Sequence, residues 1–336
     1  MHAAAINLRG GVSPRSTRLR GQSIIEYVLI IAGIGLVIVF AGPGVAGAIR
    51  NQFNLVGNTV NSGTSGNIEG GSASGGGSTG TVSATVQAAI AKDTKDWTLD
   101  EQKAVAEDIA AKGGASPAYA KAKAAMDAGI TCSVKLTNGE TMTYRIIGIN
   151  HDDLADGSGK AGLTFLTTST GIMSRVNATD TNAGGWEASE LRAKMNSGEI
   201  WNLMPSDFQS KVKPVKKLTN NVGGSDKNAA VTATVDRLFP LSYSELVKDS
   251  TNFWSSYSWI GKEGTQYEAF KGKDSPQENT DMTKISGLAN GSMFYERGTY
   301  PSTTSGFLFV TQFGTTGSGG YYVARHTKSI CPAFCF

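Results

Sequence analysis

Residues 131–149 read TCSVKLTNGETMTYRIIGI, and this stretch decides the fold class of the C-terminal part of the chain. Its two runs of apolar and β-branched residues flank Asn138-Gly139, a dipeptide typical of the tight turn in a β-hairpin. Further strand-like runs cover 163–168, 306–313, 321–325 and 329–336. Helices are expected over 188–197 and 242–247, with long irregular loops between the elements. This mixture predicts an α+β domain over residues 130–336.

A helical segment over residues 82–129 precedes this domain. Thr98 stands three residues before Glu101, the spacing of a capping box, and the helix that it starts is expected to reach Lys112. Two glycines then end it, and a second helix is expected from Ser116-Pro117 to about Asp127.

Residues 57–81 consist almost entirely of Gly, Ser, Thr and Asn. This composition is typical of a flexible linker, which at this length spans roughly 25–30 Å as a random coil. The linker would hold the segments that follow it away from an anchor or a fibre surface.

The formal net charge of the chain is +3, but residues 1–21 contain four arginines and no acid. Subtracting these four arginines from +3 leaves −1 for residues 22–336. A nearly neutral chain gives no electrostatic basis for binding nucleic acid, so we expect no partner of that class.

Residues 18–40 read RLRGQSIIEYVLIIAGIGLVIVF, in which Glu26 stands at the start of an apolar run. The 22 residues from Val28 to Ile49 carry no charge, and a helix of this length spans about 33 Å, enough to cross a bilayer core. A carboxylate at the edge of hydrocarbon is costly and therefore indicates a function. Two simpler interpretations stay open: a secretory signal cut at 46–48, and a plain membrane anchor with Glu26 among the headgroups.

The basic leader, Gly21, Glu26, Tyr27 and the length of the apolar run resemble the prepilins of type IV pilus systems. The likeness is greatest to the Flp-type (type IVb) pilins of tight-adherence (Tad) systems, and it covers about residues 18–51. It implies that a prepilin peptidase removes residues 1–21.

Cleavage between Gly21 and Gln22 would create a new ammonium group on Gln22. The resemblance implies that Glu26, with Tyr27 beside it, acts in assembly, because its carboxylate would compensate the ammonium charge of a neighbouring subunit. The helix of 22–56 would cross the membrane once and then join a pilus with other pilin subunits and the assembly machinery. The many residues beyond this helix favour a minor or decorated pilin.

Four further segments resemble a family of bacterial exported domains without assigned function. They are YRIIGINHDDLADGSGKAGLTF (144–165), WEASELRAKMNSGEIWNLMP (186–205), LFPLSYSEL (238–246) and YYVARHTKSICPAFCF (321–336). The family is related to the C-type-lectin-like fold, near the formylglycine-generating enzymes. The resemblance implies a ligand-display scaffold over 130–336.

The chain contains three cysteines, an odd number that allows one disulfide with a spare thiol, or three thiols. In folds of the kind that the resemblance implies, the first and last strands pair. Cys132 would then form a disulfide with Cys331 or Cys335, of which Cys335 is favoured. Three small buried residues without a disulfide are the alternative.

The chemical motifs of the chain are sparse. Residues 150–157 resemble a calcium loop, but Leu154 and Leu163 occupy positions where an EF-hand needs oxygen ligands, so a polar turn is favoured and a calcium-supporting loop is the alternative. No His-x-x-x-His, Cys-x-x-Cys or serine nucleophile elbow occurs. We therefore predict no catalytic residue, no metal ligands and no cofactor beyond this calcium, and we do not expect an enzyme.

Aromatic and basic residues gather among Gly, Ser and Thr over 292–326, a composition typical of binding surfaces. Strand alternation requires part of this set to be core. The candidates for ligand binding are Tyr295, Arg297, Tyr300, Tyr321, Tyr322, Arg325 and His326.

Together these patterns predict a pilin-like adhesin of the bacterial cell envelope. It would cross the membrane once before assembly and then display a lectin-like domain outside the cell to a glycan or protein ligand. The alternative is a membrane-anchored surface protein or enzyme that never enters a fibre.

Overall fold

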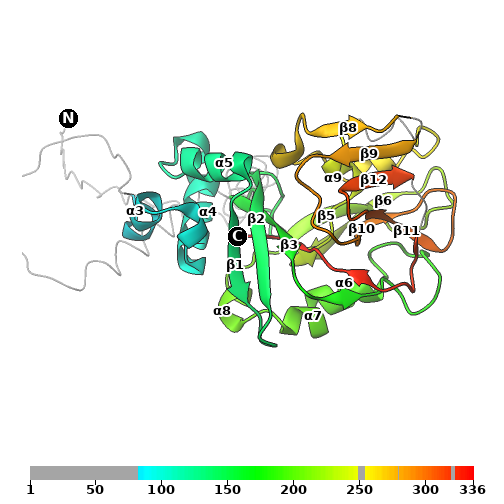
Figure 1. Ribbon diagram of the computed structural model, residues 1–336, viewed down its shortest axis with the longest axis horizontal. Coiled ribbons are helices and arrows are strands. Elements are labelled where there is room, and N and C mark those ends of the chain that lie inside the picture. The colour runs from blue at the N-terminus through cyan, green and yellow to red at the C-terminus, as the bar shows by residue number, and fades with distance from the viewer. Residues whose placement is uncertain (1–81, 249–253, 279, 319–321) are drawn as a thin grey trace, which may run out of the picture. The chain divides into compact units, whose positions relative to one another are not determined.

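The computed structural model describes residues 82–248, 254–278, 280–318 and 322–336, which all belong to one compact unit. These residues form a mixed α+β fold with several sheets (Figure 1), which confirms the predicted fold class at this level. Within the described ranges, no helix combines the length and the apolar composition of a membrane span. The following predictions lie outside the described residues: the leader, the helix of 22–56, the linker of 57–81, Gly21, Gln22, Glu26 and Tyr27.

The first described helices are α3 (Ala84–Ala91), α4 (Leu99–Lys112) and α5 (Tyr119–Ala128). The predicted capping box is present: Glu101 N–H donates to Thr98 Oγ1 at 3.2 Å, and Thr98 N–H donates to the Glu101 carboxylate at 2.7 Å. Gly129 ends α5 with a left-handed φ of 64°. Both helices predicted for this segment are therefore confirmed, and the second begins slightly later than expected.

The first sheet contains the predicted hairpin. Across the sheet its strands are β1 (Thr131–Lys135), β2 (Thr141–Ile149), β3 (Leu163–Ser169), β15 (Ala333–Cys335) and β7 (Leu238–Phe239). β1 and β2 pair antiparallel with Val134 opposite Met142, and Gly139 has the positive φ, 88°, that the turn requires. α5 packs against β2, and α4 packs against β3.

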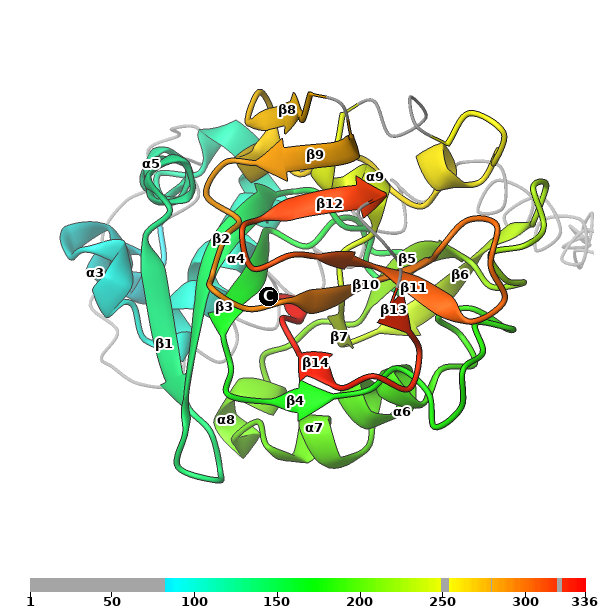
Figure 2. The same ribbon diagram turned by 45° about the vertical axis from the view of Figure 1, so that its right-hand side comes forward.

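Three further sheets complete the fold. The second has the order β13 (Tyr322–Val323), β11 (Gly306–Val310), β10 (Phe294–Thr299), β14 (Lys328–Ser329) and β4 (Met173–Ser174). The third has the order β12 (Thr315–Ser318), β9 (Asp281–Ile285) and β8 (Asp274–Pro276). β5 (Val215–Asn220) pairs with β6 (Val231–Asp236). Figure 2 shows the third sheet beside β10 and β11 of the second.

Short helices connect these strands. The α-helical turns are α6 (Glu190–Asn196), α7 (Glu199–Asn202), α8 (Ser206–Gln209) and α9 (Tyr243–Leu246). The 3₁₀ turns are Thr94–Asp96, Gly113–Ala115, Ile260–Lys262 and Glu268–Phe270. α6 and α9 lie inside the ranges predicted as helix.

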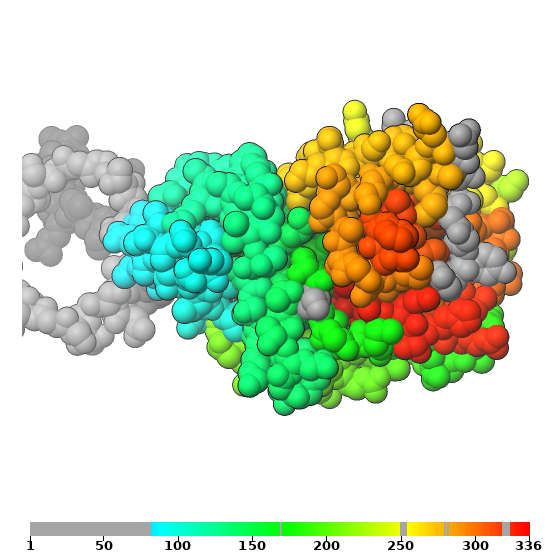
Figure 3. Space-filling model, viewed as in Figure 1, coloured from blue at the N-terminus to red at the C-terminus, as the bar shows by residue number. Residues whose placement is uncertain are grey.

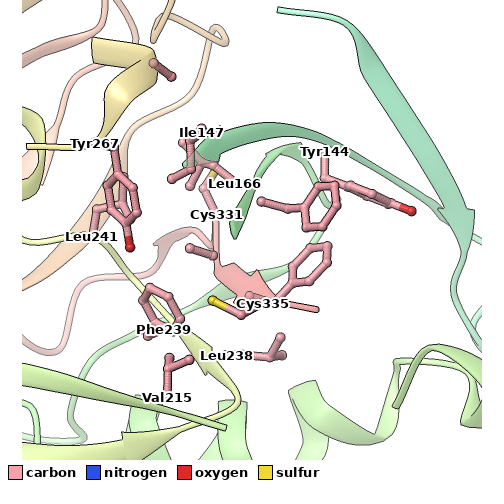
Figure 4. Packing of buried hydrophobic residues seen from close by; sticks show 14 of the residues in the cluster. Tyr144, Ile147, Leu166, Val215, Leu238, Phe239, Leu241, Tyr267, Cys331 and Cys335 are labelled. Atoms are coloured by element: carbon pink, nitrogen blue, oxygen red, sulfur yellow. The ribbon is translucent and has the colours of Figure 1, made fainter. Parts of the chain in front are cut away.

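Aromatic rings form the core around the first sheet. Centroid distances of 4.7–5.7 Å connect Tyr144, Phe165, Phe208, Phe334 and Phe336. Burial of one such side chain contributes about 1.5–3 kcal/mol to stability. Figure 4 shows Cys335 in the middle of this core, with Tyr144 on one side and Tyr267 on the other.

The predicted disulfide is wrong in this structure, where all three cysteines are buried free thiols. The sheet order explains why: β2 and β3 lie between β1, which carries Cys132, and β15, which carries Cys335. The two strands expected to pair are therefore separated. Burial raises the pKa of Cys132 to about 11 and that of Cys331 to about 12.

The strand predicted over 329–336 is interrupted. Pro332 cannot donate a hydrogen bond to a ladder, and the chain passes there from β14 in the second sheet to β15 in the first. The strand predicted from Gly306 ends at Val310. β5, β6, β8, β9, β10 and β12 were not predicted. Most of their sequences lack clear alternation, although β6 reads VTATVD, in which apolar and polar residues do alternate.

Candidate functional site

A surface pocket of about 690 Å³ lies where the chain leaves β2. The end of β2, Lys160, α9 with the residue Lys248 after it, and the segment 261–272 surround the pocket. Its side chains are polar or charged, and it includes several glycines. The pocket therefore suits a polar ligand.

A close approach between β2 and the segment 261–272 builds the pocket wall. A Cβ on Gly148 would lie 2.8 Å from Tyr267 Cδ1, so glycine is needed to let the tyrosine ring reach the strand. The next turn uses Asn150, which has a positive φ of 51°. Asn150 N–H donates to Gly162 O at 3.1 Å, and its side chain donates to Ile109 O at 3.2 Å. These contacts fix the direction in which His151 leaves the strand.

His151 forms the centre of the pocket wall. Its ring stacks on Tyr267 with centroids 4.0 Å apart and an interplanar angle of 26°. Nδ1 lies 3.2 Å from the Glu268 carboxylate, and Nε2 lies 3.2 Å from Thr265 O. Nε2 also lies 3.4 Å from the Thr265 hydroxyl, which can donate to it, so each ring nitrogen has a hydrogen-bond partner. Burial would raise the pKa of Glu268, but its contact with His151 lowers the pKa to about 2.

Three exposed lysines stand around His151. Lys160 Nζ donates to His151 O and to Asp153 Oδ1, both at 2.9 Å. Lys271 Nζ lies 3.3 Å from Glu268 Oε1. Among the described residues, no acceptor lies within hydrogen-bonding distance of Lys248 Nζ. Four basic side chains therefore line the pocket with one carboxylate, Glu268.

A buried charge network lies behind the pocket wall. The Tyr267 hydroxyl donates to the Asp152 carboxylate at 2.9 Å, and Lys217 Nζ lies 2.6 Å from Asp152 Oδ1 and 2.5 Å from Glu245 Oε1. Both oxygens of Glu245 then bind Arg297, at 2.5 and 2.9 Å. Burial would raise the pKa of Asp152, but the Lys217 ammonium outweighs it and lowers the pKa to about 2. The network therefore holds alternating, compensated charges in the interior.

Two more carboxyl groups adjoin this network without a matching cation. Burial raises the pKa of Glu263 to about 7 and that of Glu296 to about 8. Each has one oxygen, Oε2, without a hydrogen-bond partner among the described residues. Four buried carboxyl groups thus share two buried cations, Lys217 and Arg297, and the last two acids retain their protons to higher pH than an ordinary carboxyl group.

The structure separates the residues predicted to bind a ligand. Tyr295, Arg297 and Tyr300 are buried, and Arg297 is fully enclosed because Glu245 neutralises it. The structure therefore places these three side chains in the interior and not at the predicted ligand-binding surface. Arg325 and His326 are exposed in the C-terminal segment, whose surface is red in Figure 3. Tyr321 and the side chain of Tyr322 lie outside the described residues.

Residues 150–157 form the polar turn that the sequence analysis favoured over a calcium loop. Asp152 points into the buried charge network, and Asp153 bridges to Lys160 across the turn. Within the described ranges, no group of three or more His, Cys, Asp or Glu side chains is placed to hold a metal ion.

The sequence analysis did not identify Lys248, Glu268 or Lys271 as site residues. These residues belong to segments of ordinary surface composition, and nothing in their spacing points to His151, more than ninety residues upstream. The polar segment around His151 was the available signal, and it was interpreted as a turn or a calcium loop.

Comparison with known proteins gives one family. Residues 161–336 match the family model described as "Domain of unknown function (DUF6273)". No curated protein and no solved structure matches the chain. The matched range includes Lys248, Glu268 and Lys271 and excludes His151 and Lys160.

Proposed function

The chain belongs to the DUF6273 family, whose description assigns no function, and we propose that it is a pilin-like surface adhesin. In this proposal it is not an enzyme. A prepilin peptidase removes residues 1–21, the apolar helix anchors the chain and enters a pilus, and the linker presents the folded unit outside the cell. The folded unit binds a glycan or protein ligand through the pocket around His151.

The pocket is the observation that carries the binding part of this proposal. Its volume lies within the range of about 300–1,000 Å³ that is usual for ligand sites. His151 is fixed in it by stacking on Tyr267 and by contacts with Glu268 and Thr265. Such preorganisation lowers the entropic cost of binding.

The display part of the proposal rests on the sequence before residue 82. Gly21, Gln22, Glu26 and Tyr27 match the pattern of a prepilin, and a Gly/Ser-rich stretch separates them from the folded unit. The C-type-lectin-like relationship of residues 130–336 is also proposed from sequence resemblance. The separation of β1 from β15 departs from the strand pairing that this relationship implies.

N-terminal sequencing of the exported protein tests the pilin assignment. A mature chain that begins at Gln22 is the expected result. A chain that begins at Met1 or after Ala48 would overturn the pilin assignment and leave an anchored surface protein.

The variant Glu26→Ala tests the assembly step separately. We expect normal cleavage, because Gly21 and Gln22 are unchanged, but loss of the chain from sheared pili, because the charge on Gln22 would lose its compensation. Glu69→Ala, in the linker, is the matched control and should assemble normally. Incorporation of Glu26→Ala at the level of the control would refute the role of this carboxylate.

A further inference from the structure

We propose that the pocket around His151 selects a saccharide that carries an anionic group. This inference rests on the proposed binding function and names the class of ligand. The shared chemistry is an oxygen-bearing anion, carboxylate or sulfate, attached to a sugar ring.

The charge of the pocket favours an anion. Lys160, Lys248 and Lys271 are exposed around it, and the basic side chain of His151 stands among them. Glu268 is the one carboxylate in the pocket lining, and it already contacts His151 and Lys271. The Lys248 ammonium has no acceptor among the described residues. An incoming anion would therefore meet an excess of positive charge.

The backbone of the pocket offers further donors. Gly264, Thr265 and Gln266 line the pocket in succession. Among the described residues, none of these three backbone N–H groups has an acceptor within hydrogen-bonding distance. Gly264 has a φ of 147°, a conformation that side chains rarely adopt, so glycine permits this backbone path. Successive unpaired N–H groups are suited to the oxygens of an anion.

The remaining surface of the pocket favours a sugar over an apolar ligand. Apart from the charged side chains, the lining consists of Asn150, Ser244, Thr265, Gln266 and three glycines, without an aliphatic or aromatic side chain. The apolar part of the lining therefore comes from methylene groups, glycine backbone and the His151 ring, which suits the mixed polar and apolar faces of a sugar. A volume of about 690 Å³ exceeds the need of an isolated inorganic anion and suits a ligand of saccharide size.

Calorimetric titration of the full-length protein in detergent tests this inference. The probes are a glucuronic-acid-containing disaccharide, its sulfated counterpart, the neutral disaccharide of the same linkage, and inorganic phosphate. We expect an acidic disaccharide to bind at least tenfold more tightly than the neutral one, since a hydrogen bond to a charged group contributes about 1.5–3 kcal/mol. Binding should weaken as salt is added. The two acidic probes distinguish a carboxylate from a sulfate ligand.

Substitution of the lysines localises the effect. Lys271→Met and Lys248→Met should each lower the affinity for the acidic disaccharide roughly three- to tenfold, and Lys271→Arg should restore most of it. Lys123→Met is the matched control, because Lys123 is an exposed lysine that pairs with Asp127 on α5. Its affinity should equal that of the unmodified chain. Since all three lysines are exposed, the thermal midpoints should agree.

Three outcomes would overturn the inference. They are equal affinity for acidic and neutral disaccharides, binding of phosphate without binding of any disaccharide, and equal loss of affinity in Lys271→Met and Lys123→Met. Absence of binding to every probe would also overturn it. In each of these cases a mature N-terminus at Gln22 would leave the pilin assignment intact. Conversely, a chain that binds the acidic disaccharide selectively but has another mature N-terminus would refute the pilin assignment and leave the inferred ligand class standing.

Discussion

The imidazole ring of His151 lies on the phenol ring of Tyr267, and the hydroxyl of the same tyrosine donates to Asp152 in the interior. Tyr267 therefore belongs both to the pocket wall and to the buried charge network. Its ring supports His151, which lines the pocket, while its hydroxyl donates a hydrogen bond to a buried carboxylate. Substitutions that affect one of these parts can separate binding from stability.

Tyr267→Phe keeps the ring under His151 but removes the hydroxyl, which contacts both Asp152 and Lys217. We expect a loss of about 1–3 kcal/mol in the free energy of unfolding, because buried acceptors lose a donor. Urea denaturation of the full-length chain measures this loss. Ligand affinity should change little, and an unchanged stability would contradict the importance of the hydroxyl. Tyr119→Phe, at a half-buried position on α5, is the control.

Lys217→Met leaves Asp152 and Glu245 buried without the ammonium that both contact. Breaking a buried ion pair in this way costs about 3–5 kcal/mol, so we expect a large loss of stability. Asp152→Asn in the same chain should recover part of it, because one unpaired charge is removed. A double-mutant cycle measured by denaturation tests this expectation, and additive losses would refute the coupling.

Stability should depend on pH through Glu263 and Glu296. Their pKa values rise from an ordinary 4.5 to about 7 and about 8 in the folded chain. The folded state therefore retains protons that the unfolded state has lost. The contribution of these two groups to the free energy of unfolding is fully present below pH 4.5. It declines from pH 4.5 upward, by up to about 1.4 kcal/mol per pH unit for each group, until the pH passes about 7 for Glu263 and about 8 for Glu296.

The variant Glu296→Gln isolates one of these two groups. Glutamine keeps the shape and a neutral side chain, so we expect a flatter decline between pH 5 and 8 and a more stable protein at pH 9 than the unmodified chain. Denaturation midpoints measured between pH 5 and 9 give the comparison. An identical pH profile for the two proteins would show that Glu296 does not titrate in this range.

The opposite dependence is expected in acid. The pKa values of Asp152 and Glu268 fall to about 2 in the folded chain. Their contribution is present above the ordinary values of 3.8 and 4.5, and it is lost as the pH falls toward 2. Asp152→Asn should reduce the acid sensitivity, measured as the change in unfolding free energy between pH 5 and pH 3.

The three cysteines should be titratable as thiols after denaturation without a reductant. In the folded chain they should react slowly, because Cys132, Cys331 and Cys335 are buried and their pKa values are raised. A thiol reagent with an optical readout counts them before and after unfolding. A count of one thiol in the denatured exported protein would restore the disulfide that the sequence analysis predicted.

Local signals made part of this fold predictable. The Asn138-Gly139 turn and the capping box at Thr98 each depend on residues within a few positions, and both are present in the structure. β3 and β15 were both predicted as strands, but their pairing with each other was not, since pairing between distant segments leaves no trace in a short window. The disulfide prediction failed for the same reason.

The interpretation of Arg297 failed because its partner is remote in sequence. An arginine among tyrosines and glycines is typical of a binding surface, yet Glu245, 52 residues earlier, binds it in the interior. The pocket was missed for a related reason: His151 and Glu268 are 117 residues apart. Only the folded chain brings them together.

The position of β15 has a consequence for biogenesis. Cys335 pairs with a strand residue, Thr164, that precedes it by 171 positions, and the strand lies between β3 and β7. Segments so distant must meet before this layer can close, which makes folding slow. A chain synthesised only as far as residue 330 lacks this strand, so the first sheet cannot close until nearly all of the domain has been made.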